Sequence, residues 1–262
     1  FAVGILAGGV CGVLLLGKLW RVMCFPAAVL ADASHPLRHV FVAAIPSSLV
    51  LLPTVSVVHG GYSPWADAVW MLGAVGLLMS TVGVVWRWLQ PGMSADDFWR
   101  GMTPALFIPV VGNVLTPLAG VALGFETWSA AQAGVGLLMW PVVLALLLVR
   151  IGVAGLWPER LLPTTFITIA PPAVIGLAVL QLGAPVLLAW VFWGVALLFV
   201  LWSFRVFKRS ISQPFAIPFW GMSFPLAAFA ALTLRLSEQT GAWFQAIATV
   251  VHALASLVVA AL

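Results

Sequence analysis

Apolar residues are gathered into long runs, and short breaks of glycine, proline and charged residues separate one run from the next. Nine runs are long enough to cross a bilayer as a helix, which needs about 20 mainly apolar residues. Their connections are short, so each expected helix should lie antiparallel to its neighbour. The expected spans are residues 1–20, 37–58, 66–89, 103–123, 127–150, 161–182, 185–205, 215–235 and 241–262, with 21–36 and 90–101 as the longest links.

The composition agrees with this pattern, because 63% of the 262 residues are hydrophobic and only 7% are charged. A water-soluble domain has too little interior to hide that much apolar surface. A transmembrane β-barrel needs alternating segments of about 10 residues, whereas these runs are about twice that length and do not alternate. The sequence therefore predicts an all-α polytopic membrane protein with one transmembrane domain over residues 1–262.

Basic residues mark one end of alternate spans. Ten of them share one set of ends, and only Arg235 falls at the other set. The ten are Lys18, Arg21, Arg38, Arg87, Arg100, Arg150, Arg160, Arg205, Lys208 and Arg209. Because basic residues concentrate in cytoplasmic loops, we expect a multi-pass protein of the inner (plasma) membrane with a cytoplasmic C-terminus. This placement accounts for the net charge of +4 without a nucleic-acid partner.

With nine spans and a cytoplasmic C-terminus, residue 1 would lie outside the cell. One further span before it is expected, which would give ten spans in five helical hairpins. If the further span is numbered 1, spans 3, 5, 7 and 9 are residues 37–58, 103–123, 161–182 and 215–235. These four spans carry internal prolines at a regular spacing. Pro46, Pro109 and Pro172 are 63 residues apart, and Pro225 follows 53 residues later. The interiors of the other spans lack proline, apart from Pro141.

A proline removes a backbone N–H and bends a helix, and the carbonyl it frees must be satisfied by protein or by water in a cavity. The alternation therefore predicts kinked inner helices around a central pore and unkinked outer helices facing lipid. The competing interpretation is that prolines are simply common in transmembrane helices. Hydroxyl and amide residues also favour the proline-bearing spans. The candidate pore-lining or kink residues are Phe41, Pro46, Ser47, Phe107, Pro109, Asn113, Thr116, Phe166, Thr168, Pro171, Pro172, Ser223 and Pro225.

Acidic and basic residues are missing from positions well inside the spans. Pumps and ion-coupled carriers usually need such residues, so their absence favours passive conduction. His252 is the one interior ionisable group, and we expect it to be packed and neutral on an outer span. No spacing typical of metal ligands or of a phosphate-binding loop occurs. We therefore expect no enzyme, no cofactor and no metal site.

Four stretches carry a resemblance to a known family. They are "HPLRHVFVAAIP" from His35, "TPALFIPVVGNVLTPLAGVALG" from Thr103, "PERLLPTTFITIAPPAVIGLA" from Pro158 and "FWGMSFPLAAFA" from Phe219. Their order and spacing resemble the tellurite-resistance/dicarboxylate transporter family, which includes bacterial TehA and the plant guard-cell slow anion channels. The chain begins at what would be the second helix of that family.

The resemblance implies ten helices in five hairpins, with the odd helices lining a pore in each subunit of a homotrimer. It also implies that a phenylalanine of the ninth helix plugs the pore, and this residue aligns with Phe224. Members of the family pass chloride and nitrate, or carry malate, sulfite or tellurite-related solutes. The expected partners are therefore small inorganic anions or dicarboxylates and the lipid bilayer.

Three functions stay open at the level of sequence. The first is an anion channel that is occluded by Phe224, and the second is a secondary carrier for malate or another small dicarboxylate, or a tellurite- or sulfite-related exporter. A structural or sensory membrane protein is the third. The structural interpretation of Phe224 is an ordinary packed aromatic residue.

Overall fold

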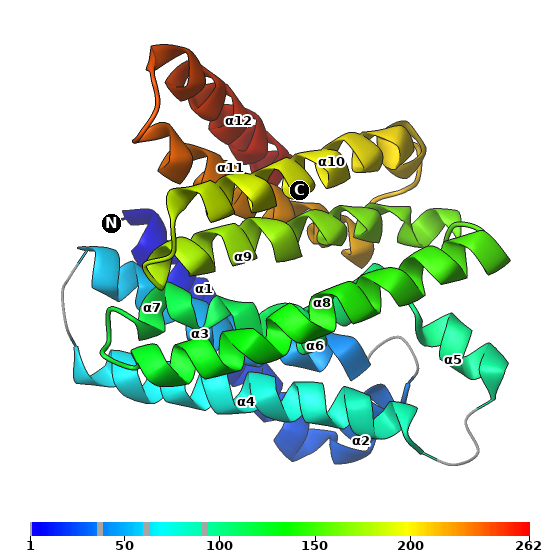
Figure 1. The fold of residues 1–262 in the computed structure, drawn as a ribbon. Helices are drawn as coiled ribbons and strands as arrows, with labels where there is room; N and C mark the ends of the chain where they lie inside the picture. The colour runs from blue at the N-terminus through cyan, green and yellow to red at the C-terminus, as the bar shows by residue number, and fades with distance from the viewer. Residues whose placement is uncertain (1, 36–38, 60–62, 91–93) are drawn as a thin grey trace. The chain divides into compact units, whose positions relative to one another are not determined.

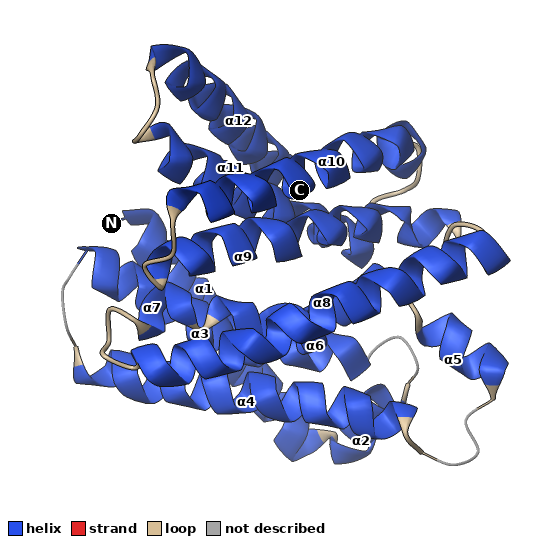
Figure 2. Cartoon of the chain, viewed as in Figure 1, coloured by secondary structure: helices blue, strands red, loops and turns tan. Residues whose placement is uncertain are grey.

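The structure is a computed structural model that describes residues 2–35, 39–59, 63–90 and 94–262. Within these residues Figure 2 shows helices and loops and no strand. The α-helices are α1 (Ala2–Cys24), α2 (Pro26–Ser34), α3 (Ala44–His59), α4 (Pro64–Trp88), α5 (Ala95–Gly101), α6 (Phe107–Val111), α7 (Pro117–Gly120), α8 (Glu126–Ala154), α9 (Ala170–Gln181), α10 (Val186–Ile211), α11 (Ser223–Ser237) and α12 (Ala242–Ala261). The 3₁₀ segments are η1 (His39–Ala43), η2 (Pro104–Leu106), η3 (Gly112–Leu115), η4 (Glu159–Ile169) and η5 (Ile217–Met222).

Eight helical stretches among the described residues are long and apolar enough to cross a membrane, and a ninth exists if 95–120 counts as one broken span. The predicted all-α polytopic class is therefore confirmed. The predicted span 103–123 is not a single helix, because it is divided into η2, α6, η3 and α7. The two long links also contain short helices, α2 and α5. Arg38 and the start of the predicted span 37–58 lie outside the described residues.

The repeat prolines share one structural position. Pro46, Pro109, Pro172 and Pro225 are each the third residue of an α-helix, namely α3, α6, α9 and α11. A 3₁₀ segment comes directly before each of these helices. Each proline-bearing span therefore changes from 3₁₀ to α geometry at its repeat proline.

This position has a physical cause. Proline has no N–H to donate to the carbonyl four residues back, and at each repeat proline that carbonyl belongs to the 3₁₀ segment upstream. The tighter 3₁₀ segment upstream uses bonds to the third residue back, such as the N–H of Ser223 donating to the carbonyl of Trp220. The prolines accordingly set the boundary between two helix types. By contrast, α8 continues through Pro141 as a single helix of 29 residues.

The chain divides into two compact units, one formed by residues 1–101 with 108–136 and the other by 102–107 with 137–262. In the first unit α3 and α4 form a close hairpin. A Cβ added to Gly73 would lie 2.7 Å from the backbone nitrogen of Val50, and one added to Gly76 would lie 2.8 Å from Cβ of Pro46. Only glycine therefore allows the two helices to approach this closely.

The second unit contains η4, α9, α10, η5 and the hairpin of α11 and α12 (Figure 1, orange to red). Rings join its last three helices. Trp193 of α10 stacks on Phe229 of α11 with centroids 5.9 Å apart, and Trp190 meets Phe244 of α12 at 4.8 Å. The indole N–H of Trp193 also donates to Oγ1 of Thr233 over 2.9 Å. Aromatic packing thus holds α12 to the rest of its unit.

Burial only partly follows the predicted division into inner and outer helices. The proline-bearing span 159–181 has 94% of its most apolar window buried, and 217–237 has 44%, against 0–33% for the continuous spans. The span 39–58 is the exception at 22%, which is less than the 33% of its continuous neighbour 64–88. The predicted division therefore does not hold for 39–58.

Candidate functional site

The broken span of the first unit carries a buried polar network at η3. The side-chain amide of Asn113 donates from Nδ2 to Oγ1 of Thr81 on α4 over 2.6 Å. Its carbonyl oxygen accepts from Nε2 of Gln132 on α8 over 2.8 Å, and the same Nε2 donates to the carbonyl of Ala74 over 2.7 Å. All three side chains are at most 4% exposed. One amide of the broken span is thus bound to both neighbouring continuous helices.

The same neighbours donate hydrogen bonds to two backbone carbonyls of the broken span. Thr81 donates from Oγ1 to the carbonyl of Pro109 over 2.7 Å. The indole N–H of Trp70 donates to the carbonyl of Thr116 over 3.1 Å, and Oγ of Ser129 donates to the same oxygen over 3.4 Å. In lipid such carbonyls need partners inside the protein or in a wet cavity. Neutral side chains of α4 and α8 are thus among the partners of these two carbonyls, and the carbonyl of Thr116 also accepts from the N–H of Gly120 over 3.0 Å.

Close packing accompanies this network. The ring of Phe125 lies parallel to that of Trp70 with centroids 5.0 Å apart. A Cβ on Gly120 would collide with Trp70 and with Oγ of Ser129, and a Cβ on Gly136 would lie 2.9 Å from the carbonyl oxygen of Val111. The broken span is therefore held at fixed distance from α4 and α8, both by hydrogen bonds and by the absence of side chains at two glycines.

In the second unit, η4 runs through 11 residues, which is long for a 3₁₀ helix. Thr168 donates from Oγ1 to the carbonyl of Thr165 over 2.8 Å, and Oγ of Ser203 on α10 lies 3.5 Å from the same oxygen. Oγ1 of Thr165 itself is buried and has no hydrogen-bond partner among the described residues. Phe166 is 1% exposed and meets Phe207 edge to face at 6.1 Å.

Phe224 is the second residue of α11, directly before Pro225 and directly after the change from 3₁₀ to α geometry. Its side chain is 40% exposed, and no ring contact within the described residues involves it. Its neighbour Ser223 donates from Oγ to the carbonyl of Trp220 over 2.7 Å. A Cβ on Gly221 would lie 3.3 Å from Ile167, so η5 lies against η4 at this point. The ring of Phe224 is thus exposed, while the segment directly before it packs closely on η4.

The other predicted residues fall into groups. Pro46 is buried beside Gly76, and Ser47 returns its hydroxyl to the carbonyl of Ala43 over 2.8 Å. Thr116 donates to the carbonyl of Asn113 over 2.9 Å, so these two belong to one network. Phe107, Pro109, Pro171, Pro172 and Pro225 are buried, whereas Phe41 is 43% exposed. A pore-lining role for these residues stays a prediction.

Sequence reasoning assigned no role to Thr81, Gln132 and Ser129, because they belong to continuous spans. A polar residue inside an otherwise apolar span was the signal that could have found these three, since such residues usually face protein rather than lipid. His252 was predicted to be packed, and this is wrong, because its side chain is exposed on α12.

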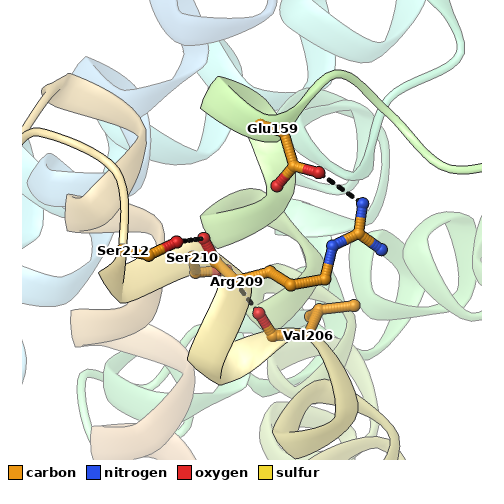
Figure 3. A network of polar contacts seen from close by, with 5 residues as sticks. All are labelled: Glu159, Val206, Arg209, Ser210 and Ser212. Carbon is orange, nitrogen blue, oxygen red and sulfur yellow. Dashed lines mark hydrogen bonds and ion pairs between the residues drawn. The ribbon is translucent and has the colours of Figure 1, made fainter.

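Charged side chains lie at the start of η4 (Figure 3). The carboxylate of Glu159 at the start of η4 forms an ion pair with the guanidinium of Arg209 near the end of α10. Both side chains are about half exposed. Nearby, Arg150 at the end of α8 lies 5.2 Å from the ring centroid of Trp157 and donates to the carbonyl of Gly155 over 2.6 Å. These contacts attach the entrance of η4 to two continuous helices.

Comparison with known proteins agrees with this architecture. The family model described as SLAC1, voltage-dependent anion channel, matches residues 1–262. An uncharacterized transporter of Methanocaldococcus jannaschii is 23% identical over 84% of this chain and 69% of its own length. The S-type anion channel SLAH2 of Arabidopsis thaliana is 25% identical over 93% of this chain and 47% of its own length.

The tellurite resistance protein TehA homolog of Haemophilus influenzae is 26% identical over 87% of this chain and 68% of its own length. The chain thus spans about half the length of the plant relative and about two thirds of the other two. The family resemblance seen in four stretches of sequence is confirmed. The chain belongs to the SLAC1 family of voltage-dependent anion channels.

Proposed function

We propose that this protein is a channel that passes small anions such as chloride and nitrate through a pore within each subunit. Membership of an anion-channel family supports anion transport. Passive conduction is favoured because the buried polar groups of the broken span are uncharged. The buried polar groups at the broken span are amides, hydroxyls and one indole, and none of them can carry a proton between two charge states at neutral pH.

We propose that Phe224 occludes this pore. The observation that supports it is the position of Phe224 in the proline repeat. The residues that precede the four repeat prolines are Ile45, Ile108, Pro171 and Phe224, so only the last span places an aromatic ring there. That ring is 40% exposed, while Phe166 and Phe107 in the same unit are at most 4% exposed. A bulky ring in a narrow apolar passage blocks ions by its size and by excluding water.

The start of α11 supports selectivity for anions. Phe224 lies in the first turn of α11, and its neighbours in the chain, Ser223 and Pro225, carry no charge. An anion that reaches Phe224 would meet the half-buried Ser223 rather than a carboxylate. Displacement of the ring requires a change of side-chain rotamer, which needs no backbone movement.

Recording from purified protein in planar bilayers tests this proposal. Unitary anion currents that increase when Phe224 is replaced by alanine would support the channel. Saturable, proton-linked uptake of malate without unitary currents would instead identify a dicarboxylate carrier and refute the channel. Chloride, nitrate, malate and sulfite gradients should be compared in the same preparation.

The remaining features of the proposal concern assembly and orientation. We propose a homotrimer with a separate pore in each subunit, located in the plasma membrane with the C-terminus in the cytoplasm. The family resemblance supports the trimer, and the clustering of Arg150, Arg205, Lys208 and Arg209 near one end of their helices supports the orientation. The orientation can be tested with a cysteine added at the C-terminus of the protein. In intact cells, a thiol reagent that cannot cross the membrane should label a cytoplasmic cysteine only after the membrane is opened.

A further inference from the structure

Helix α12 has an unusual distribution of side chains around its axis. It packs on its unit through Phe244, Ala248 and Ala255, which are at most 6% exposed. Nearly all other residues of the helix are exposed. The exposed residues divide into an apolar face, which includes Val250 and Leu254, and a polar face. A helix that faced lipid all round its free surface would be apolar there.

The polar face is a regular stripe, here called the α12 seam. It consists of Gln245, Thr249, His252 and Ser256, and all four are exposed. They are separated by four, three and four residues, which is the a/d spacing of helices that pack along a common seam. With 3.6 residues per turn, the seam lies about 90° around the helix from the packed face. The exposed Leu254 lies on nearly the opposite side from His252.

The seam crosses the middle of the membrane. The 20 residues of α12 are about 30 Å long, which equals the thickness of the hydrocarbon core. His252 is the eleventh of them, so it lies near the bilayer centre. Neither His252 nor Ser256 has a side-chain hydrogen bond within the part of the chain that the structure describes, whereas Thr249 donates to the carbonyl of Gln245 over 2.9 Å. Lipid tails offer His252 no partner.

Polar and ionisable side chains at this depth are rare on a lipid-facing surface and normally pair with other polar groups. We propose that the α12 seam is the contact between copies of this chain, with α12 helices of neighbouring copies packed seam to seam around a shared axis. This inference deepens the self-association of the proposed function and does not depend on anion conduction.

A second copy fits the seam because the seam is chemically complementary to itself. Amide, hydroxyl and imidazole groups each both donate and accept hydrogen bonds, so identical faces can pair without an excess of donors or acceptors. The residue one heptad before Thr249 is Ala242, and a small side chain there allows two helices to approach closely. Burial of His252 against a second copy would remove the cost of leaving it in lipid.

Disulfide crosslinking of the whole chain in liposomes tests this inference. Cys11 and Cys24 are the chain's only cysteines, so a C11S/C24S background is free of thiols. In that background we would compare His252→Cys with Leu254→Cys, which has the same depth but points away from the seam. Thr249→Cys is the second seam variant, in case His252→Cys fails to fold.

Oxidation should produce a crosslinked species of two chains for His252→Cys and Thr249→Cys, in several-fold greater yield than for Leu254→Cys. Equal yields at all three positions, or crosslinking at Leu254→Cys alone, would overturn the inference. A crosslink from the seam to a different protein in native membranes, or a monomeric mass of the uncrosslinked protein, would overturn it too. Anion currents are recorded from the same liposomes, so loss of crosslinking with intact currents separates this inference from the proposed channel.

Discussion

Replacement of Asn113 by leucine should measure how strongly the polar network holds the broken span. Leucine has nearly the same shape as asparagine but can neither donate nor accept a hydrogen bond. The substitution removes the 2.6 Å bond to Thr81 and the 2.8 Å bond from Gln132. It leaves one N–H of the Gln132 amide without a partner in a side chain that is 3% exposed. The other N–H keeps its bond to the carbonyl of Ala74.

The size of the effect follows from these losses. Each buried hydrogen bond contributes about 1 kcal/mol, and an orphaned buried donor costs about 1–3 kcal/mol. Burial of the apolar leucine side chain offsets part of this. We therefore expect Asn113→Leu to lower the free energy of unfolding by roughly 2–4 kcal/mol.

Thermal unfolding in detergent micelles, followed by intrinsic tryptophan fluorescence, measures this change. Ser48→Ala is the control, because Ser48 is exposed and, among the described residues, its hydroxyl bonds to the carbonyl of Ala44 in its own helix. Adding Gln132→Met should restore part of the stability of Asn113→Leu, since it removes the orphaned N–H. If Asn113→Leu unfolds at the wild-type temperature, or if the two substitutions are additive, the network does not hold the break as described.

Three further predictions concern single contacts. Gly120→Ala should unfold at least several degrees below the wild type, because its Cβ would collide with Trp70. Gly134→Ala is the control: its Cβ would meet open space, so it should unfold within a few degrees of the wild type. Equal unfolding temperatures for the two variants in a thermal melt would contradict the packing. Glu159→Gln breaks an ion pair that is half exposed and should change stability by at most about 1 kcal/mol, so a larger loss in the same melt would show a role beyond charge pairing. Phe166→Ala should cost about 3–5 kcal/mol because the ring is almost fully buried, and a loss under about 1 kcal/mol would refute its place in the core.

The sequence predicts the class and most spans because both depend on local properties. Continuous helices such as α4 and α12 lie within two residues of the predicted runs, since length and hydropathy define them. The proline repeat was also visible, because each proline acts on its own backbone. The switch from 3₁₀ to α geometry at each repeat proline was not predicted. A proline inside an apolar run is compatible both with a bent α-helix and with a change of helix type, so the sequence does not distinguish them.

The polar network could not be predicted because its partners are far apart in the sequence. Gln132 binds Asn113 across 19 positions and Ala74 across 58. Hydropathy shows that such residues are polar, but it does not show which way they face. The same limit explains the error at His252, because the sequence does not show which face of α12 packs on its unit. Phe224 was found through the family resemblance, and its exposure could only come from the structure.

The central proposal is that Phe224 occludes an anion pore, and chloride conductance of Phe224→Ala in planar bilayers tests it most directly. The control is Phe204→Ala, which removes a ring that is 57% exposed from the continuous helix α10. Because Phe224 is 40% exposed and stacks on no ring in the described chain, its loss should leave the unfolding temperature nearly unchanged. We expect Phe224→Ala to raise the unitary or macroscopic chloride current several-fold while Phe204→Ala matches the wild type. Wild-type currents from a correctly folded Phe224→Ala protein would contradict the account.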